Sequence, residues 1–434
     1  MSVSKGVSTT NITPTWVERM GLHRWYAISG DSPDLELWAT ALGTRYLFDT
    51  DPARDPELNP ARTLKERLRR VLGRNPKSPW HGVAGFSAIT EGWNSAVYAS
   101  RYGPSGSMIV YGGGHNDYFG SDVHAFDLAS REWRRIADGY VSGRDDEYGA
   151  GARYPASVYP DGSPLPPHTY DYVQYDPLGN DYILLKGQTE LGPNVKAVAI
   201  PHLFNLDTLT WRNGPQHPTA ILNSGGWSTW DASRRVVWGH SGDDGGGNAF
   251  IGFSPDEDNR NGTFGRWTNH FPNKLPGIAN HNAMQIDPVR DLIVVSVHAR
   301  DALYAIDPTD PAHEIEHLES AGPKPVLRPY AAMEYAPNLA CLVYFSPLDG
   351  GIVYTIAAPQ ERRSRDELAA KWSWLPYRPA ADTLDPIADA ASRSRHPLNL
   401  SQTFGRFRIA SFGTIDLAIL VRHVDSAVYA MRLT

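Results

Sequence analysis

Short apolar runs separated by turn residues recur along most of this chain. Six of them have an apolar centre, and all but the fourth end at a small, polar or charged residue: SMIVYGGG, DYILLKG, RRVVWGH, DLIVVSV, ACLVYFS and LAILVRH. Continuous apolar runs of this length are typical of strands that are buried on both faces. Alternating segments follow several of them, such as AFDL, LFNLD and LYAID, and these predict strands with one more polar face. The hydrophobic pattern therefore predicts an all-β chain.

The apolar runs belong to a unit that repeats with loose spacing. Each unit opens with small, polar and aromatic residues, and the six openings read WNSA, HTYD, WSTWD, HNAM, YAAM and RFR. Four units close on a tryptophan, at Trp133, Trp211, Trp267 and Trp372. Strands of period two also occur in β-sandwiches, but a repeated apolar run, turn, strand and tryptophan favours the blades of a β-propeller.

The ends of the chain bear on how such a ring would close. The last unit stops at VYAMRLT after three strands, so we expect the N-terminal segment HRWYAIS to supply its fourth strand by pairing near Val428. Residues 18–79 could add a degenerate blade, with PARTLKERLRRVLGR as a short outer helix. The sequence thus predicts one domain over residues 1–434, a seven-bladed propeller of the Kelch or galactose-oxidase-like type with six clearly readable blades and residues 1–80 as the closing segment.

Composition narrows the classes of partner. The net charge of -7 gives no indication of nucleic-acid binding, and no apolar stretch is long enough for a membrane span. An aromatic content of 11% suits blade packing and also sugar binding, because sugar rings stack on flat faces. The single cysteine, Cys341, excludes intrachain disulfides. The N-terminus has no apolar core and does not read as a secretory signal, so a cytosolic location and a trimmed signal both stay open.

The blade pattern also predicts which side chains share a face. The start of a first strand and the loop after a second strand reach the same face of the ring and converge on its axis. This rule, with His168 added because it lies two positions before Tyr170, selects Asn94, His115, His168, Tyr170, Lys186, Trp227, His281, Arg328, Tyr330, Arg406 and Arg408. The set holds imidazoles, phenols and cations but no paired carboxylates, which argues against ordinary glycoside hydrolysis by two acids.

Four of these residues resemble the catalytic set of the Kelch-like propeller polysaccharide lyases, which include the ulvan lyases and the rhamnose–glucuronate lyase. In those enzymes a His opens the first readable blade and a second His follows a glycine run. A Tyr then opens the next blade, and a basic residue ends that blade's second strand. Here His115 follows Asn94 by 21 positions and Lys186 follows Tyr170 by 16. Asn94 stands for the family's first His and Lys186 for its Arg.

The resemblance implies β-elimination of a 4-linked uronate in an acidic polysaccharide or oligosaccharide, without a required cofactor. Lys186 and the arginines would neutralise the carboxylate, with Asn94 donating a hydrogen bond. Tyr170 and His115 would serve as base and acid, in either order. The remaining residues of the set would bind substrate: His168, Trp227, His281, Arg328, Tyr330, Arg406 and Arg408. The candidate cations belong to a protein of negative net charge, so we expect the ligand to be an anion. We also expect Asn94, His115, Tyr170 and Lys186 to cluster on one face of the propeller.

Other interpretations remain open. A non-catalytic Kelch-type module that binds a glycan or protein would need the same face without reactive geometry, and a hydrolase or isomerase of uronic sugars would share its cations. Each selected side chain could instead be a turn, packing or solvated residue. The loop at residues 243–247, DDGGG, could hold calcium or could be a surface turn, so a structural calcium or zinc ion is one possibility. Galactose oxidase is a propeller of the same type, but its copper site needs a cysteine near a tyrosine on the axis. Cys341 lies inside an apolar strand, so copper oxidation is disfavoured.

Overall fold

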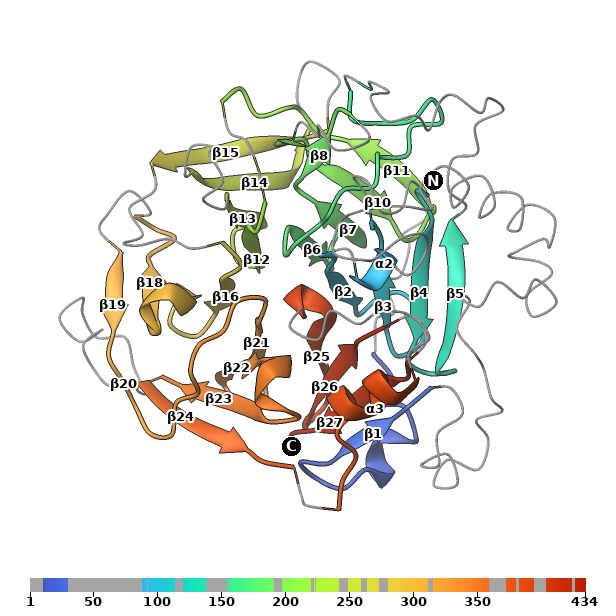
Figure 1. Ribbon diagram of the computed structural model, residues 1–434. Coiled ribbons are helices and arrows are strands. Elements are labelled where there is room, and N and C mark those ends of the chain that lie inside the picture. The colour runs from blue at the N-terminus through green and yellow to red at the C-terminus, as the bar shows by residue number, and fades with distance from the viewer. Residues whose placement is uncertain are drawn as a thin grey trace, which may run out of the picture.

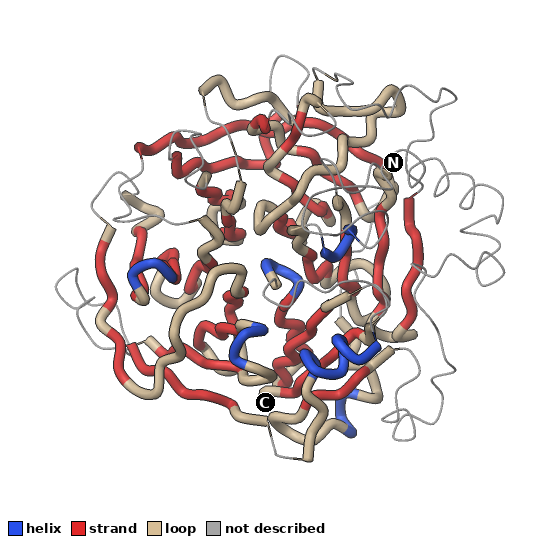
Figure 2. The backbone as a smooth tube through the Cα atoms, in the orientation of Figure 1, coloured by secondary structure: helices blue, strands red, loops and turns tan. Residues whose placement is uncertain are grey.

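The computed structural model describes the chain in segments that together form a ring of β-sheets around an axis (Figure 1). The described residues are 11–29, 88–91, 93–113, 120–137, 154, 156–190, 197–219, 222, 224–241, 249–258, 264–272, 280–310, 315–358, 372–379, 382–393, 403–423 and 426–434. Strands dominate these residues, as the red segments of the tube show (Figure 2), and this confirms the predicted all-β class.

Each blade is a sheet whose first three strands are antiparallel and run in sequence order from the axis outward. Blade one is β2 (Ala96–Ala99), β3 (Ser107–Val110), β4 (Val123–Asp127) and β5 (Glu132–Ala137). Blade two is β6 (Val173–Asp176), β7 (Asp181–Leu184), β10 (His202–Asn205) and β11 (Thr210–Asn213), with a separate hairpin of β8 (Gly187–Gln188) and β9 (Ala197–Val198). Blade three is β12 (Trp227–Asp231), β13 (Val236–His240), β14 (Ala249–Asp258) and β15 (Phe264–Pro272).

The remaining blades follow the same plan. Blade four is β16 (Ala283–Asp287), β17 (Leu292–Val297), β18 (Ala302–Ile306) and β19 (Glu316–Leu318). Blade five is β21 (Ala332–Ala336), β22 (Cys341–Phe345), β23 (Val353–Ala357) and β24 (Trp372–Tyr377), with β20 (Ser320–Ala321) added in parallel at its edge. Blade six is β25 (Phe407–Phe412), β26 (Ile415–Val421), β27 (Val428–Arg432) and β1 (Trp25–Ala27).

Six blades close the ring, and the preferred count of seven is corrected on this point. Each inner strand contacts the inner strand of the next blade, in the order β2, β6, β12, β16, β21 and β25. Strand β25 also contacts β2 directly, which leaves no room for a further blade between the last and the first. Of residues 18–79, where a further blade and its outer helix were expected, residues 30–79 lie outside the described residues.

The predicted closure by the N-terminus is confirmed. Strand β1 comes from the HRWYAIS segment and pairs antiparallel with β27, with Trp25 opposite Met431 and Ala27 opposite Tyr429. The indole of Trp25 is buried and donates a hydrogen bond to the Gly351 carbonyl in blade five at 2.7 Å. Joining the two ends of the chain in one sheet removes two exposed strand edges, the arrangement by which propellers protect their rings.

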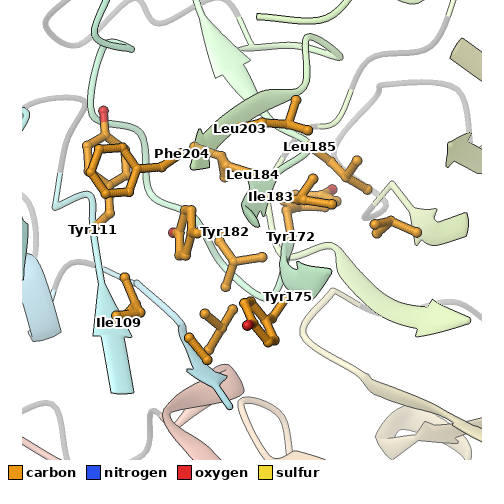
Figure 3. Packing of buried hydrophobic residues seen from close by; sticks show 14 of the residues in the cluster. Ile109, Tyr111, Tyr172, Tyr175, Tyr182, Ile183, Leu184, Leu185, Leu203 and Phe204 are labelled. Carbon is orange, nitrogen blue, oxygen red and sulfur yellow. The ribbon is translucent and has the colours of Figure 1, made fainter. Parts of the chain in front are cut away.

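The side chains within each blade explain why the sequence repeats as it does. Second strands such as β22 and β26 are buried along their whole length, because blades pack on both of their faces. In blades one to three the tryptophan of the outer strand packs on an aromatic ring of the third strand. The centroid distances are 5.4 Å for Trp133–Phe126, 5.0 Å for Trp211–Phe204 and 5.3 Å for Trp267–Phe253. Figure 3 shows the core between blades one and two, where Tyr111 lies near Tyr182.

Helices are few among the described residues. They comprise α2 (Ala88–Glu91), α3 (Pro386–Arg393) and four 3₁₀ turns: Val17–Arg19, His298–Arg300, Pro347–Asp349 and Phe404–Arg406. None of the helices in the described segments has the length and hydropathy of a membrane span.

Candidate functional site

The residue that leads into each inner strand has a left-handed backbone. The φ angles are 52° at Trp93, 46° at Tyr170, 70° at Gly225, 67° at His281, 64° at Tyr330 and 45° at Phe404, one for each blade. Bulky side chains rarely adopt this region, at a cost of about 1–3 kcal/mol each. Backbone hydrogen bonds link these positions between blades, including Tyr170 N–H to the Trp93 carbonyl at 2.7 Å. The fold therefore places a bulky residue near the axis, at the entrance of the inner strand, in five of its six blades.

Five rings meet there and form what we call the axial aromatic cluster: His168, Tyr170, His281, Tyr330 and Phe404. The ring centroid of Tyr170 lies 5.8 Å from that of His281 and 5.9 Å from that of Phe404, although the three residues come from blades two, four and six. Residues of non-adjacent blades can touch only near the axis. Phe404 is 2% exposed and Tyr170 is 5% exposed, whereas His281 and Tyr330 are partly exposed with centroids 4.3 Å apart. A ligand at this face would therefore meet His281 and Tyr330 first.

Lys186 adds a cation to the cluster. It follows β7, as the pattern predicted, and its Nζ lies 4.3 Å from the centroid of the Tyr170 ring. It also lies 6.0 Å from the Tyr172 ring. The side chain is buried, so its charge acts in a medium of low dielectric constant, where cation–π attraction is strong. The structure thus brings together five residues of the predicted set: His168, Tyr170, Lys186, His281 and Tyr330.

A buried ionic network lies beside this cluster. The Arg408 guanidinium forms ion pairs with Glu334 and, at 3.3 Å, with Asp171, and it donates to the Ala96 carbonyl at 2.8 Å. Burial raises the pKa of Glu334 to about 7 and also raises that of Asp171, while the Arg408 charge opposes both shifts. Arg408 therefore joins four blades and is not the exposed substrate cation that was expected.

Three other predicted residues are also enclosed by the protein. Asn94 is fully buried, accepts from Thr169 N–H at 2.9 Å and donates to the Ile89 carbonyl at 3.3 Å. Arg406 is fully buried and donates to the Asn94 and Val421 carbonyls. Trp227 is fully buried against His240, with parallel rings 4.5 Å apart, so its face is not open to a sugar.

Arg328 and His115 differ from these. The Arg328 side chain is partly exposed, and its buried Nε has no hydrogen-bond partner among the described residues. Burial raises the pKa of Asp349, and the Arg328 charge opposes that shift. His115 lies outside the described residues, as does the DDGGG loop at residues 243–247. Within the described segments no three His, Cys, Asp or Glu side chains are grouped as metal ligands would be.

The sequence rule selected too few second-strand ends. Basic or imidazole residues also stand at the ends of second strands in other blades: His240 ends β13, His298 follows β17 and Arg422 follows β26. His298 is held by its Nε2 against the Asn280 carbonyl at 2.8 Å, and Arg422 is fully buried. The runs RRVVWGH, DLIVVSVH and LAILVRH carried this signal, because each places a basic or imidazole residue directly at the end of the apolar core. Applied to every blade, the same rule would have found them.

A Ser–His–Asn arrangement also appears, in blade two. Ser157 Oγ lies 3.2 Å from His202 Nε2, and His202 Nδ1 lies 2.6 Å from Asn213 Oδ1. Ser157 has a left-handed φ of 63°, and its Oγ accepts from Gln188 N–H at 2.8 Å. The order of groups resembles a nucleophile, a base and an orienting residue. Ser157 and His202 are both 0% exposed, however, so no substrate reaches them and the arrangement serves the fold.

We expect His202 to make the protein sensitive to acid. Burial lowers its pKa to about 4, and the hydrogen bond to Asn213 opposes that shift. In the unfolded state the His202 imidazole binds a proton below about pH 6.5, whereas in the folded state it does so only near pH 4. The neutral imidazole therefore contributes its full stability above about pH 6.5, and this stability is lost as the pH falls. The loss approaches about 3 kcal/mol by pH 4. Urea unfolding at several pH values should show the gap between wild type and His202→Gln narrowing toward pH 4. Parallel curves would contradict this.

Comparisons with known proteins add little beyond the fold. No family model matches the chain, and no curated protein matches it. Among solved structures, an alpha-L-arabinanase of Penicillium chrysogenum, in complex with arabinobiose, is similar at 12% identity with a TM-score of 0.41. The match covers 79% of this chain and 93% of the arabinanase. We take no activity or ligand from so distant a likeness, and the propeller assignment rests on the strand order and ring contacts described above.

Proposed function

We propose that this protein is a polysaccharide lyase that cleaves an acidic, uronate-containing polysaccharide by β-elimination. The observation that carries the proposal is the Lys186 ammonium 4.3 Å from the Tyr170 ring centroid, beside the imidazoles of His168 and His281. A buried cation next to a phenol stabilises the phenolate, which is the form of the side chain that can act as a base. The spacing of Asn94, His115, Tyr170 and Lys186, which resembles that of the Kelch-like propeller lyases, supports the same reaction.

In the proposed step the C5–H and C4–O bonds of the uronate break and a C4–C5 double bond forms. The Tyr170 phenolate takes the C5 proton and becomes the neutral phenol, and the departing glycosidic oxygen receives a proton from His115 or an axial imidazole. Lys186 and Arg328 stabilise the charge that develops on the carboxylate, since guanidinium and ammonium groups are strong donors to carboxylate oxygens. His281 and Tyr330, the partly exposed rings of the cluster, contact the sugar.

A second candidate is a non-catalytic propeller that binds an acidic glycan. It is favoured by the low exposure of Tyr170 and Lys186, 5% and 4%, which leaves them little surface for chemistry in this conformation. A uronic-sugar hydrolase or isomerase would use the same cations without forming a double bond. Ultraviolet absorbance during incubation with polyuronates separates the lyase from both alternatives, because only elimination creates a conjugated C4–C5 double bond.

We expect activity on polyuronates and none on matched neutral glycans, because the axial cation selects a carboxylate. Lys186→Met keeps the length of the side chain and removes its charge, and it should lower the elimination rate by about 10²-fold or more. The measurement is the initial rate at which new reducing ends form on a polyuronate and on its carboxyl-reduced form, because this rate reports cleavage of either polymer. Lys324→Met is the control, since Lys324 forms its ion pair with Asp301 at 2.6 Å, on a partly exposed surface. Equal rates on both polymers would contradict the selection of an anion.

A further inference from the structure

Five side chains from three blades form a buried polar cluster next to Tyr170, which we call the polar clamp: Asn94, Ser95, Thr169, Asp171 and Arg408. Asn94 Oδ1 accepts from Thr169 N–H at 2.9 Å, and Thr169 Oγ1 accepts from Ser95 N–H at 2.8 Å. Ser95 Oγ donates to Asp171 Oδ1 at 3.1 Å, and Arg408 Nη2 lies 3.3 Å from the same oxygen. Thus the entrance to blade one is bonded to both residues that flank Tyr170.

Two glycines fit closely against this cluster. A Cβ added at Gly112, in the glycine run after β3, would lie 2.8 Å from Asn94 Oδ1 and 2.8 Å from Thr169 Cγ2. A Cβ added at Gly405 would lie 2.1 Å from Ser95 Oγ and 2.5 Å from Asp171 Oδ1. At such distances a side chain at either position would displace atoms of the clamp. The backbones of the segments that contain Gly112 and Gly405 therefore pack directly against the clamp.

The backbone of Tyr170 shows what the clamp holds. Its φ of 46° lies in the region that bulky residues rarely adopt, and its N–H donates to the Trp93 carbonyl at 2.7 Å. A residue stays in that region only when its surroundings determine its conformation. Here the fixed neighbours are Thr169 on one side and Asp171 on the other, and the resulting conformation directs the ring toward Lys186.

We propose that the polar clamp positions Tyr170, and that Asn94 acts through this clamp rather than by touching the substrate. The assignment of a reaction to Tyr170 rests on the proposed function, whereas the conformational part does not. Asn94 is 0% exposed and bonded at both ends of its carboxamide, which suits a positioning residue. The clamp keeps the phenol against the ammonium, and small displacements of a reacting group carry large rate penalties.

Thr169→Val tests this with a matched control. It removes the hydroxyl that accepts from Ser95 N–H while keeping the shape of the side chain. Thr229→Val removes an equivalent fully buried hydroxyl that accepts from Ile286 N–H at 3.0 Å, between blades three and four. We expect Thr169→Val to lower kcat by about 10- to 100-fold with little change in KM, and Thr229→Val to leave both unchanged. Equal losses in the two variants would overturn the inference, because they would reflect general destabilisation.

A double variant separates positioning from an independent contribution. If the clamp acts through the Tyr170 hydroxyl, Thr169→Val combined with Tyr170→Phe should be no slower than Tyr170→Phe alone. Multiplied losses would overturn the inference. If Tyr170→Phe keeps full activity, the assignment of the base to Tyr170 within the proposed function fails instead. Should Thr169→Val not fold, Ser95→Ala is tested in the same way, because it removes only the hydroxyl that bonds Asp171.

A crystal structure of the clamp variant gives a readout that needs no activity. We expect Tyr170 to leave its left-handed conformation, or its ring to move away from Lys186, in Thr169→Val but not in Thr229→Val. A Tyr170 unchanged in position in the Thr169→Val structure would overturn the inference even if the protein proves to be a lyase. A displaced Tyr170 in a protein without elimination activity would support the clamp and reject the proposed function.

Discussion

Tyr170→Phe is expected to lower the rate of elimination by about 10²–10⁴-fold, the usual contribution of a positioned general acid or base. The substitution keeps the ring that packs against His281 and Phe404 and removes only the hydroxyl. Because the ring contacts remain, the free energy of unfolding should change by at most about 1 kcal/mol, the contribution of one hydrogen bond. Initial rates on a polyuronate and urea unfolding curves measure the two effects separately.

The matched control for this prediction is Tyr335→Phe. Tyr335 lies on the inner strand β21, is partly exposed, and has a pKa that burial raises. It is therefore a phenol of the same propeller at a distance from the strand entrances, and its loss should leave the rate unchanged. If Tyr170→Phe and Tyr335→Phe turn over substrate equally fast, Tyr170 is not the base, and His281 with Arg328 becomes the site to test next.

The propeller could be predicted from the sequence because its strands have simple requirements. Blades pack on both faces of their second strands, so these strands read as continuous apolar runs, and the outer tryptophans pack on third-strand aromatics. The three-strand ending at VYAMRLT likewise predicted the pairing of Trp25 with Met431. The blade number could not be read in this way, because it depends on contact between β25 and β2, which are far apart in the sequence.

The candidate site was predictable only in part, for a similar reason. A position at a strand end indicates which face a residue lies on, and this placed Tyr170, Lys186 and His281 together. It does not indicate whether the side chain points outward or is enclosed by neighbours. Arg408 and Asn94 were therefore expected to contact substrate, although their partners, Asp171 and Thr169, come from another blade. Such long-range pairing leaves no pattern along a single sequence.

Arg408→Met is expected to destabilise the folded protein by about 3–5 kcal/mol, the usual cost of removing one member of a buried ionic network. The side chains of Arg408 and Asp171 are 6% and 7% exposed, and that of Glu334 is 14% exposed. Without the guanidinium, two carboxylates would lie in a region with little solvent and would lose the positive charge with which both of them pair. Burial already raises the pKa of both, and removing Arg408 removes the charge that opposes the shift. Folding would then require Glu334 to bind a proton.

Urea unfolding of the Arg408→Met variant should therefore give a lower midpoint than wild type, and the difference should grow as the pH rises above the ordinary range of carboxylate titration. The sign follows from the raised pKa values: the folded state binds protons that the unfolded state has released, so stability is lost with increasing pH. Arg24→Met provides the control, because the Arg24–Asp382 pair lies at the surface with side chains 34% and 76% exposed. Exposed pairs contribute little, so its midpoint should match wild type. Equal midpoints for Arg408→Met and Arg24→Met would mean that the axis of the propeller does not depend on the charge that joins four of its blades.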